Sequence, residues 1–550
     1  MHLKLRMRRY TTAKQPVLAF ALPFEGHLDT QNKWVILANA LPWDDLVKPY
    51  LKTLCQNNGR PSVDARQVVA AFIIKHLKNL SDEQTIDEIK ENPYLQYFAG
   101  LHAFQQEKLF EPSLFVALRK RMGDATFDEM NDVILKCFAT QTPPKGKDTE
   151  TIEETKDEKT EDKTEDNDDK TEDKNEDKTE DKAENKSNKS DDSKADKSDK
   201  SDLPAPHGHL KIDTTVAPQN ITFPTDLKLL NKCRVHTEHL IDGLYHELNL
   251  DTKPRTYRKD ARQAYLKIAR IKRKTKKKIR QGIKEQLNYI RRNVHTINTL
   301  WDKLDELKAD KDQSVRPENW TATDFRNWLI IQEVYRQQRE MYDTHTNRTD
   351  HRIVSISQPH VRPIVRGKEH KNTEFGAKIG LSTCNGYTRL DHFSWEAYHD
   401  AADLKLQVER YKTLHGYYPE TVNADKIYHT SENHRFLKSK GIRFIGKPLG
   451  RPTKESLTPT AQRVQRAEKA QRNHIEGKIG QMKTAYGMEN ILAKTDTTAR
   501  AWIAAIVLVT NLVRVLKDLC LMPKSKLTNI LYHISFFIKC AFSTKRSPAF

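Results

Sequence analysis

The sequence predicts a multidomain protein, with an all-α N-terminal domain, a disordered charged linker and a C-terminal α/β domain that contains a long helical section. Three observations support this prediction. Apolar residues recur at three-to-four spacing from residue 32 to about 140, almost none occur at 143–206, and alternating strands and helices begin near residue 207. A chain of 550 residues has room for about three or four domains.

The N-terminal domain is predicted over residues 32–142, after an extension at 1–31. Residues 63–77 carry apolar side chains at helical spacing, and the pattern from Ser81 to Gln84 marks the start of the next helix. Several short helices with tight turns could hold a helix-turn-helix, in which one helix enters the major groove of DNA. The same pattern is equally typical of a helical docking or dimerisation domain, so both interpretations stay open.

The linker at 143–206 repeats Lys-Thr-Glu-Asp and close variants. Its residues 148–202 contain 24 Asp and Glu against 12 Lys, with only three residues of the hydrophobic class. Such a composition cannot offset the entropy that is lost on ordering, so the segment is predicted to be a flexible spacer. A second interpretation is that its acidic charge competes with DNA for basic surfaces elsewhere in the chain.

The formal net charge of the whole chain is +19 although the linker is acidic, so the rest of the chain is strongly basic. This surplus predicts a polyanionic partner, because each Lys or Arg placed on a phosphate releases a condensed counterion. A membrane partner is not expected, since the apolar segment 501–513 is shorter than the roughly 20 residues that span a bilayer and should be a buried helix. Six scattered cysteines without a Cys-x-x-Cys pair favour a reducing, cytoplasmic setting.

The first strand of the α/β domain is predicted at 210–216. Its side chains alternate, so that Leu210 and Ile212 face one way and Asp213 faces the other. Further strands are expected at 353–357, 376–382, 421–425 and 442–446, with a helix at about 396–415.

The long helical section is predicted at about 226–346. Its part 253–292 holds 17 Lys and Arg against two acidic residues, with three tyrosines interleaved. A charge run is usually a solvated helix face, yet a surplus of this size favours contact with a phosphate backbone. The cations expected to contact DNA are Lys272, Arg273, Lys276, Lys277, Lys278 and Arg280.

Three acidic residues are candidates for metal binding. Asp213 lies in mid-strand, Asp425 at the end of a second strand, and Glu476 within a predicted helix. Such carboxylates suit Mg²⁺, which takes a few carboxylate oxygens and leaves other positions to water and substrate phosphate. Helical periodicity puts Arg472 and Lys483 on the same face as Glu476. Periodicity alone favours an ordinary amphipathic helix, with Arg472 and Glu476 as an exposed ion pair.

The segment 472–483, Arg-Asn-His-Ile-Glu-Gly-Lys-Ile-Gly-Gln-Met-Lys, resembles a family signature. It is similar to the glutamate motif of bacterial insertion-sequence transposases of the DDE class, in the branch with an InsH-like N-terminal domain. Arg472, Glu476 and Lys483 match that motif, while Lys469 stands where the family has Tyr.

Other segments resemble the same family. Leu-Lys-Ile-Asp-Thr-Thr at 210–215 is similar to its first aspartate block, and Ala-Asp-Lys-Ile-Tyr at 424–428 to its second, although Ile427 replaces the usual small residue. Gly-Arg-Pro at 59–61 and Glu-Pro-Ser-Leu-Phe at 111–115 extend the resemblance into the N-terminal region. The blocks occur in the order that the family has.

The resemblance implies an RNase H-like catalytic domain over residues 207–518. The helical section at about 226–346 would be an insertion in that domain, and 519–550 a C-terminal tail. The implied partners are DNA, as element ends and as target, and a second copy of the chain in a homodimer or larger assembly on paired ends. The implied location is the bacterial cytoplasm, in association with the nucleoid.

The resemblance also implies a reaction. Asp213, Asp425 and Glu476 would bind two Mg²⁺ ions, for which Mn²⁺ can substitute. Water would nick the DNA at an element end, and the freed 3′-hydroxyl would attack target DNA. Arg472 and Lys483 would position phosphates near the scissile bond.

Two other functions stay open. A catalytically inactive relative could act as a DNA-binding repressor, and a metal-dependent nuclease could cut without strand transfer. His207 and His209 flank a glycine, but they lack a third ligand at suitable spacing and are expected to be surface residues. Trp395 and Trp502 are expected in the core rather than stacked on a flipped base.

Overall fold

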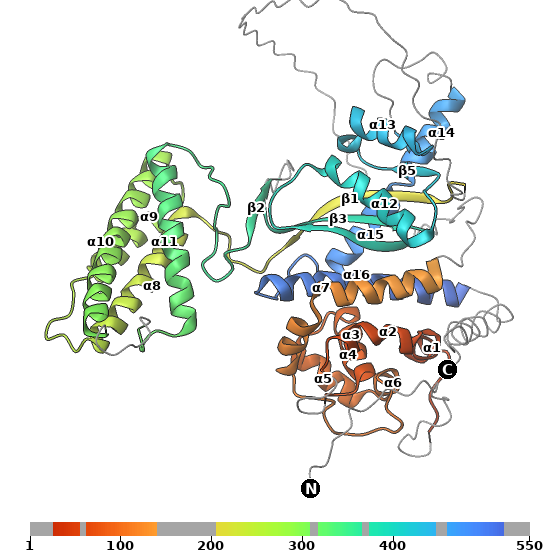
Figure 1. Ribbon diagram of the computed structural model, residues 1–550, viewed down its shortest axis with the longest axis horizontal. Helices are drawn as coiled ribbons and strands as arrows, with labels where there is room; N and C mark the ends of the chain where they lie inside the picture. Colours follow the sequence, from red (N-terminus) through yellow and green to blue (C-terminus); the bar gives the residue numbers. More distant parts are fainter. Residues whose placement is uncertain are drawn as a thin grey trace, which may run out of the picture. The chain divides into compact units, whose positions relative to one another are not determined.

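The computed structural model describes residues 26–55, 62–139, 205–308, 317–365, 373–446 and 459–521. The predicted extension at 1–31, the linker at 143–206 and the tail at 519–550 lie wholly or mostly outside these ranges, so they stay predictions. The described chain is rich in helices and contains a mixed sheet of six strands in its C-terminal part (Figure 1).

The N-terminal residues form packed helices, as the apolar periodicity predicts. Asp64 caps one of them, since its carboxylate accepts a hydrogen bond from the backbone N–H of Arg66 at 2.9 Å. Ser81 and Gln84 form a capping box at the predicted helix start. The helices are α1 (Lys33–Ala40), α2 (Trp43–Leu46), α3 (Lys48–Lys52), α4 (Ala65–Leu77), α5 (Asp82–Glu91), α6 (Pro93–Phe98) and α7 (Leu114–Ile134), which a π-helical turn (Leu135–Ala139) extends.

The sheet has the strand order β2-β3-β1-β5-β6, and β4 also pairs with β3. β1 runs antiparallel to β3 and parallel to β5, which in turn runs parallel to β6. Asn385 and Gly386, both at positive φ, make the tight turn between β3 and β4, a role that an Asn-Gly pair favours. The strands are β1 (His209–Pro218), β2 (Arg362–Val365), β3 (Thr373–Cys384), β4 (Tyr387–Ser394), β5 (Thr421–Asn423) and β6 (Arg443–Ile445).

Helices cover both faces of this sheet. The predicted alternation along β1 is confirmed, because Leu210 and Ile212 lie in one hydrophobic cluster together with residues of α12. The opposite face belongs to a second cluster that includes residues of β3, α15 and α16. The helices of this region are α12 (Asp403–His415), α13 (Ser431–Ser439), α14 (Pro459–Ala470), α15 (Asn473–Thr484) and α16 (Asp496–Leu521).

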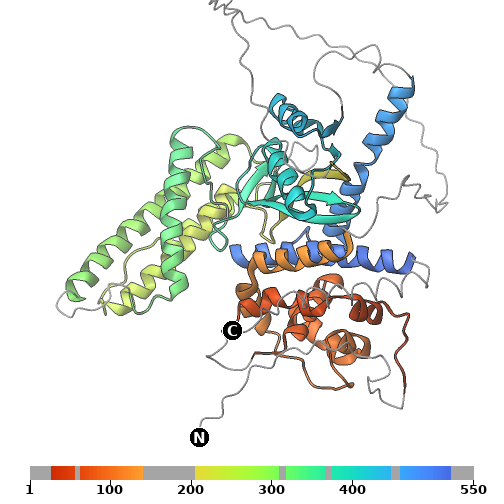
Figure 2. The same cartoon turned by 45° about the vertical axis from the view of Figure 1, so that its right-hand side comes forward.

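Four helices form a bundle between β1 and β2, where the long helical section is predicted (Figures 1 and 2). Two apolar clusters of their own join three of these helices, the first, third and fourth along the chain. The strand predicted at 353–357 is wrong, since Ile353 and Ile356 pack into one of these clusters from a segment without strand structure. The bundle consists of α8 (Asp226–Glu247), α9 (Arg258–Ala269), α10 (Lys276–Lys308) and α11 (Ala322–Asp343).

One hydrophobic core joins the N-terminal helices to the sheet through α16. The cluster contains Leu28 near its start and Leu519 near its end. Asn511 of α16 lies within it and donates hydrogen bonds to the Asn131 side chain of α7 at 2.7 Å and to the Thr388 carbonyl of β4 at 2.6 Å. The predicted buried helix at 501–513 is therefore confirmed. Within the described ranges, no helix is both long and apolar enough to cross a bilayer.

Candidate active site

Asp213 lies in the middle of β1, the central strand of the sheet. Its carboxylate accepts a hydrogen bond from the backbone N–H of Thr214 at 2.8 Å. Burial raises the pKa of Asp213. The Thr214 N–H and the charge of Arg472 oppose this rise, while the charges of Glu476 and Asp425 add to it. These influences place Asp213 close to three charged residues from distant parts of the sequence.

Asp425 follows β5, the strand that pairs with β1 in parallel. It caps a short 3-10 helix (Lys426–Tyr428) by accepting a hydrogen bond from the Lys426 N–H at 2.6 Å. Its side chain is 55% exposed, in contrast to that of Asp213. Parallel pairing of β1 with β5 explains the proximity: Lys211 is level with Asn423, the last residue of β5, so Asp213 and Asp425, each two residues further on, approach the same end of the sheet.

Glu476 and Arg472 come from the start of α15. Ile475, Ile479 and Met482 of this helix are buried in the core that α15 shares with the sheet and α16. Glu476 follows Ile475 by about 100° around the helix, so its carboxylate leaves the packed face. It is 45% exposed and forms an ion pair with Arg472.

The Arg472 guanidinium joins the carboxylates into one site. It lies 2.7 Å from Asp425 and also pairs with Glu476. Partial burial lowers the pKa of Arg472, but the charges of Asp425, Glu476 and Asp213 together outweigh burial and raise it. The structure thus joins Asp425 and Glu476 through Arg472, and the charges of all three residues act on Asp213.

The chemistry of this donor set fits a hard divalent cation. Asp213, Asp425 and Glu476 provide carboxylate oxygens, which Mg²⁺ prefers, and two of the three are open to solvent. In the described residues no group of three or more His, Cys, Asp or Glu side chains is already arranged to hold a metal ion. Arg472 provides the positive charge among these carboxylates.

Tyr428 stabilises the strand and the loop that carry Asp213 and Asp425, and the sequence alone assigns it no role at the site. Its hydroxyl shares a hydrogen bond of 2.5 Å with the Thr214 hydroxyl, next to Asp213. Burial raises the pKa of Tyr428, so the phenol stays protonated. Asn433 of α13 fixes the same loop by donating to the Tyr428 carbonyl at 2.9 Å. The only signal for Tyr428 in the sequence is its place three residues after Asp425.

The other predicted cations lie elsewhere. Lys483 is half-buried in the last turn of α15, two turns beyond Glu476. Arg280 donates to the Tyr342 carbonyl at 2.8 Å and lies 4.0 Å from the centre of that ring, so it helps to hold the helical bundle together. The side chain of Lys469 lies outside the described residues. The predicted cations that precede Arg280 are exposed at the start of α10 and before it: Lys272, Arg273, Lys276, Lys277 and Lys278.

The histidines and tryptophans behave mostly as expected. Trp395 and Trp502 are buried in the core, and the Trp502 ring lies 4.8 Å from the Lys75 ammonium. His209 is exposed and contacts the Thr421 hydroxyl at 2.8 Å, which ties β1 to β5. His207 makes an edge contact with Tyr417, and its carbonyl accepts a hydrogen bond from the Tyr411 hydroxyl at 2.8 Å. These four residues thus serve the fold or the surface.

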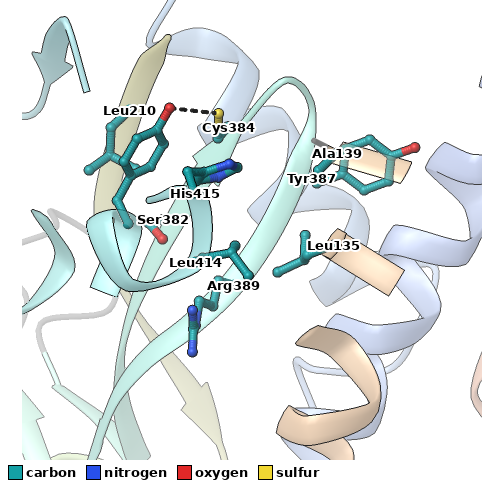
Figure 3. Close-up of a pocket in the computed structure, with 10 residues that line it drawn as sticks. Leu135, Ala139, Leu210, Ser382, Cys384, Tyr387, Arg389, Leu414 and His415 are labelled. Atoms are coloured by element: carbon teal, nitrogen blue, oxygen red, sulfur yellow. Dashed lines mark hydrogen bonds between the residues drawn. The ribbon is translucent and has the colours of Figure 1, made fainter. Parts of the chain in front are cut away.

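A pocket lies apart from the carboxylates, between the end of the N-terminal helices, the β3–β4 hairpin and α12 (Figure 3). Its lining is mainly apolar, and Ser382, Arg389 and His415 are among its polar members. Burial lowers the pKa of His415 to about 4, so its imidazole is neutral at ordinary pH. None of the three carboxylates lines this pocket, so it is distinct from the candidate site.

Two family models match the chain. A model described as "Transposase domain (DUF772)" matches residues 22–121, and one described as "Transposase DDE domain" matches residues 422–513. The second match contains Asp425 and Glu476, whereas Asp213 lies outside both.

A curated relative is also similar to part of the chain. It is "Uncharacterized protein ORF8 in nfe locus" from Rhizobium meliloti, 33% identical over 106 residues, which are 19% of this chain. The match spans 49% of the relative, about half its length. No solved structure matches the chain. Residues 22–121 and 422–513 are thus similar to transposase domains, and the second of these segments to a transposase DDE domain.

Proposed function

We propose that this protein is a DNA transposase that nicks DNA at the ends of an insertion sequence and joins the freed ends to target DNA. The observation that carries the proposal is the convergence of Asp213, Asp425 and Glu476 around Arg472. These residues come from a strand, a loop and a helix that are far apart in the sequence. A structural ion pair needs two partners, whereas Arg472 pairs with two carboxylates, and the charge of a third, Asp213, also raises its pKa.

The fold supports an RNase H-like catalytic domain. A mixed sheet with helices on both faces carries the first aspartate on its central strand, and the second lies two residues beyond the parallel neighbour of that strand. The glutamate comes from a helix that packs on the same sheet. This is the arrangement that the resemblance to DDE transposases implies, with α8–α11 as an insertion after the first aspartate.

In the proposed reaction, a water oxygen bonds to the phosphorus at the element end and the 3′ oxygen leaves as a hydroxyl. That hydroxyl then attacks a phosphorus of target DNA, so one P–O bond forms as another breaks and no external energy source is needed. Two Mg²⁺ ions, or Mn²⁺ in their place, would activate the attacking oxygen and stabilise the leaving oxygen. Asp213, Asp425 and Glu476 are the residues that would hold them.

Arg472 and Lys483 have the roles of phosphate ligands in this proposal. The guanidinium of Arg472 pairs with Asp425 and Glu476, and the same N–H groups can bind a phosphate once it is released from the carboxylates. Lys483 lies further along the same helix. A homodimer or larger assembly would hold two ends together, and the site of action would be the nucleoid.

The test is cleavage of labelled DNA that carries the ends flanking this gene, with Mg²⁺ or with EDTA. Wild type is compared with Glu476→Gln and with the control Glu489→Gln, which alters an exposed carboxylate beyond the end of α15. We expect Mg²⁺-dependent nicking in wild type and in the control, and none in Glu476→Gln. Specific binding without nicking by wild type would instead support a repressor, and nicking without joining would support a nuclease.

A further inference from the structure

The four-helix bundle α8–α11 has no counterpart in either matched family segment, because these segments cover residues 22–121 and 422–513. Its charge is strongly uneven along α10. Residues 276–295 of that helix contain seven Lys and Arg against one acidic residue, whereas 296–308 contain two Lys against three acidic residues. The basic charge is therefore confined to the half of α10 that follows the turn from α9.

The exposed cations of α10 lie on one face. Lys277, Lys284 and Arg291 follow each other at spacings of seven residues, which puts them within an arc of about 40°. All three are exposed. Fourteen residues of helix separate the first from the last, which corresponds to about 21 Å.

The exposed cations of α9 and of the turn continue this surface. Lys259, Arg262, Lys267 and Arg270 fall within an arc of about 140° on α9, and all four are exposed. The turn and the first residues of α10, at 270–278, contain seven Lys and Arg and no acidic residue. We name α9, this turn and the first half of α10 the basic hairpin (residues 258–295).

Contacts inside the hairpin fix α9 against α10. Gln286 of α10 donates to the Ala261 carbonyl of α9 at 3.1 Å. The Arg292 guanidinium of α10 lies 4.7 Å from the ring centre of Tyr257, at the start of α9. Leu287 and Ile290 of α10 are buried in the bundle. Apolar contacts thus hold the hairpin while its cations remain on the outside.

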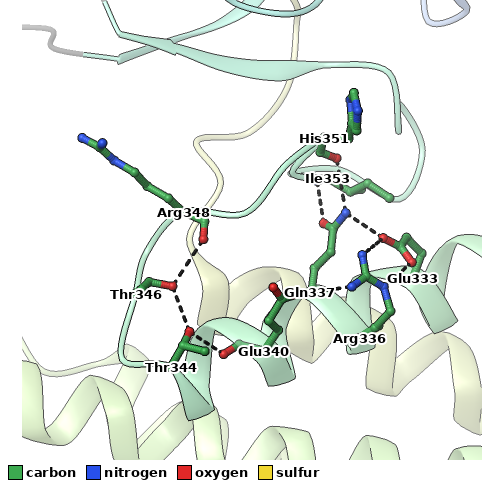
Figure 4. A network of polar contacts seen from close by, with 9 residues as sticks. All are labelled: Glu333, Arg336, Gln337, Glu340, Thr344, Thr346, Arg348, His351 and Ile353. Atoms are coloured by element: carbon green, nitrogen blue, oxygen red, sulfur yellow. Dashed lines mark hydrogen bonds and ion pairs between the residues drawn. The ribbon is translucent and has the colours of Figure 1, made fainter.

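Other cations of the bundle are neutralised within it. Arg336 of α11 pairs with Glu333 at 2.7 Å and with Glu340 at 3.0 Å, and Arg339 pairs with Asp343 at 2.7 Å. Figure 4 shows the Arg336 network on α11. The bundle therefore has one face with paired charges and a hairpin whose exposed cations add up to a strong positive field.

We propose that the basic hairpin binds the phosphate backbone of double-stranded DNA without reading its sequence. This inference rests on the proposed function for the identity of the polyanion. A duplex presents one charge per about 1.7 Å of axis, so a row of cations about 21 Å long meets enough phosphates to engage each of its members. The hairpin acts in DNA capture and takes no part in the chemistry at Asp213, Asp425 and Glu476.

The packing disfavours an anionic membrane as the partner. A helix that lies on a bilayer buries an apolar face in the lipid. Within the basic hairpin, Leu287 and Ile290 of α10 are instead buried in the core of the bundle. The hairpin offers charge without an apolar face, which suits a nucleic-acid backbone.

The experiment compares two double variants of the full chain. Lys284→Gln/Arg291→Gln removes two exposed cations of the hairpin, and the control Arg336→Gln/Arg339→Gln removes two paired cations of α11. Binding to a duplex without element ends is measured by fluorescence anisotropy at several salt concentrations. We expect the slope of log K against log salt to fall by about 2 in the hairpin variant and to stay unchanged in the control.

A second pair of changes keeps the result decisive. Lys276→Glu/Lys277→Glu reverses two charges at the exposed start of α10, where no core residue is altered, and should weaken duplex binding even more. The proposal would be overturned if the salt slope were unchanged in both hairpin variants. It would also be overturned if the slope fell as much in the α11 control as in the hairpin variants. Binding of the wild type to anionic vesicles that is lost in the hairpin variants, with duplex binding intact, would also overturn it.

The same variants separate this inference from the proposed function. Nicking of a short duplex that carries an element end is measured at saturating DNA concentration in wild type and in both hairpin variants. Retained nicking together with an unchanged salt slope would reject DNA binding by the hairpin and leave the proposed function in place. Absence of nicking in the wild type would reject the proposed function. The binding measurements would still test whether the hairpin binds duplex DNA.

Discussion

The guanidinium of Arg472 lies 2.7 Å from the carboxylate of Asp425, and the two residues are separated by 46 positions in the sequence. Arg472 also pairs with Glu476, so one cation balances two carboxylates next to the partly buried Asp213. Like charges at this separation repel when no cation lies between them. Arg472 therefore has the role of holding together the carboxylates that a metal would need.

Removal of this cation should strengthen metal binding. In Arg472→Gln the carboxylates lose their internal counter-ion, so we expect a lower melting temperature in EDTA and a larger increase on addition of Mg²⁺ than in wild type. Thermal unfolding with and without Mg²⁺ measures both effects. Arg466→Gln, on the exposed side of α14, is the control. An equal Mg²⁺ effect in wild type and Arg472→Gln would show that Arg472 does not compete with the ion.

Asp213→Asn and Asp425→Asn should each abolish nicking and leave DNA binding within about twofold of wild type. Each change removes one negative oxygen and keeps the size of the side chain, so the fold is conserved. Gel-based cleavage and anisotropy on the same labelled ends measure the two properties separately. If both variants lost binding and cleavage together, these aspartates would be structural.

Tyr428→Phe should slow nicking by disturbing the strand that carries Asp213. The change removes a hydrogen bond to the Thr214 hydroxyl of 2.5 Å in a buried position, which costs about 1 kcal/mol. Thr214→Val removes the same bond from the other side. A double-mutant cycle on the free energy of unfolding should then give a coupling of about 1 kcal/mol. Strictly additive effects would mean that the hydrogen bond contributes nothing.

Asp128 of α7 should make stability depend on pH. Burial raises the pKa of Asp128 to about 7, and Asp124 and Asp132 add to the rise while Arg389 and Arg410 oppose it. The unfolded chain has the ordinary value of about 3.9, so the folded state binds an extra proton between these values. Its stabilising effect is complete below about pH 4 and is lost as the pH rises through 7, by up to about 1.4 kcal/mol per pH unit.

The measurement is the melting temperature of wild type and Asp128→Asn from pH 5 to pH 8. Wild type should lose more stability over this range than the variant, whose amide does not titrate. Asp87→Asn, at an exposed position on α5, should follow wild type. Parallel curves for wild type and Asp128→Asn would contradict the prediction.

Local patterns in the sequence predict local features of the structure well. The two-residue period of β1 correctly separates Asp213 from Ile212, and the apolar run at 501–513 correctly predicts a buried helix. The strand predicted at 353–357 is wrong, because Ile353 and Ile356 pack against the helices of the bundle. A short apolar segment indicates that its side chains are buried, and it does not show whether the core around them belongs to a sheet.

Contacts between distant segments could not be predicted from one sequence. Helical periodicity placed Arg472 beside Glu476, but its ion pair with Asp425 depends on how α15 packs on the sheet. The hydrogen bonds of Asn511 to Asn131 and Thr388 join three elements that no local pattern relates. The predictions for the linker at 143–206 and the tail at 519–550 concern segments outside the described residues, so they stay as they are.

The core that includes both Leu28 and Leu519 has a consequence for how such a protein can evolve. The N-terminal helices cannot be exchanged as a unit between related proteins, because α16 of the other protein would have to fit the surface of α7. A recombination that joined the first third of one chain to the rest of another would leave mismatched apolar faces and a broken Asn131–Asn511 contact. The part that precedes the linker and the part that follows it must therefore be inherited together, whatever changes accumulate in the acidic segment between them.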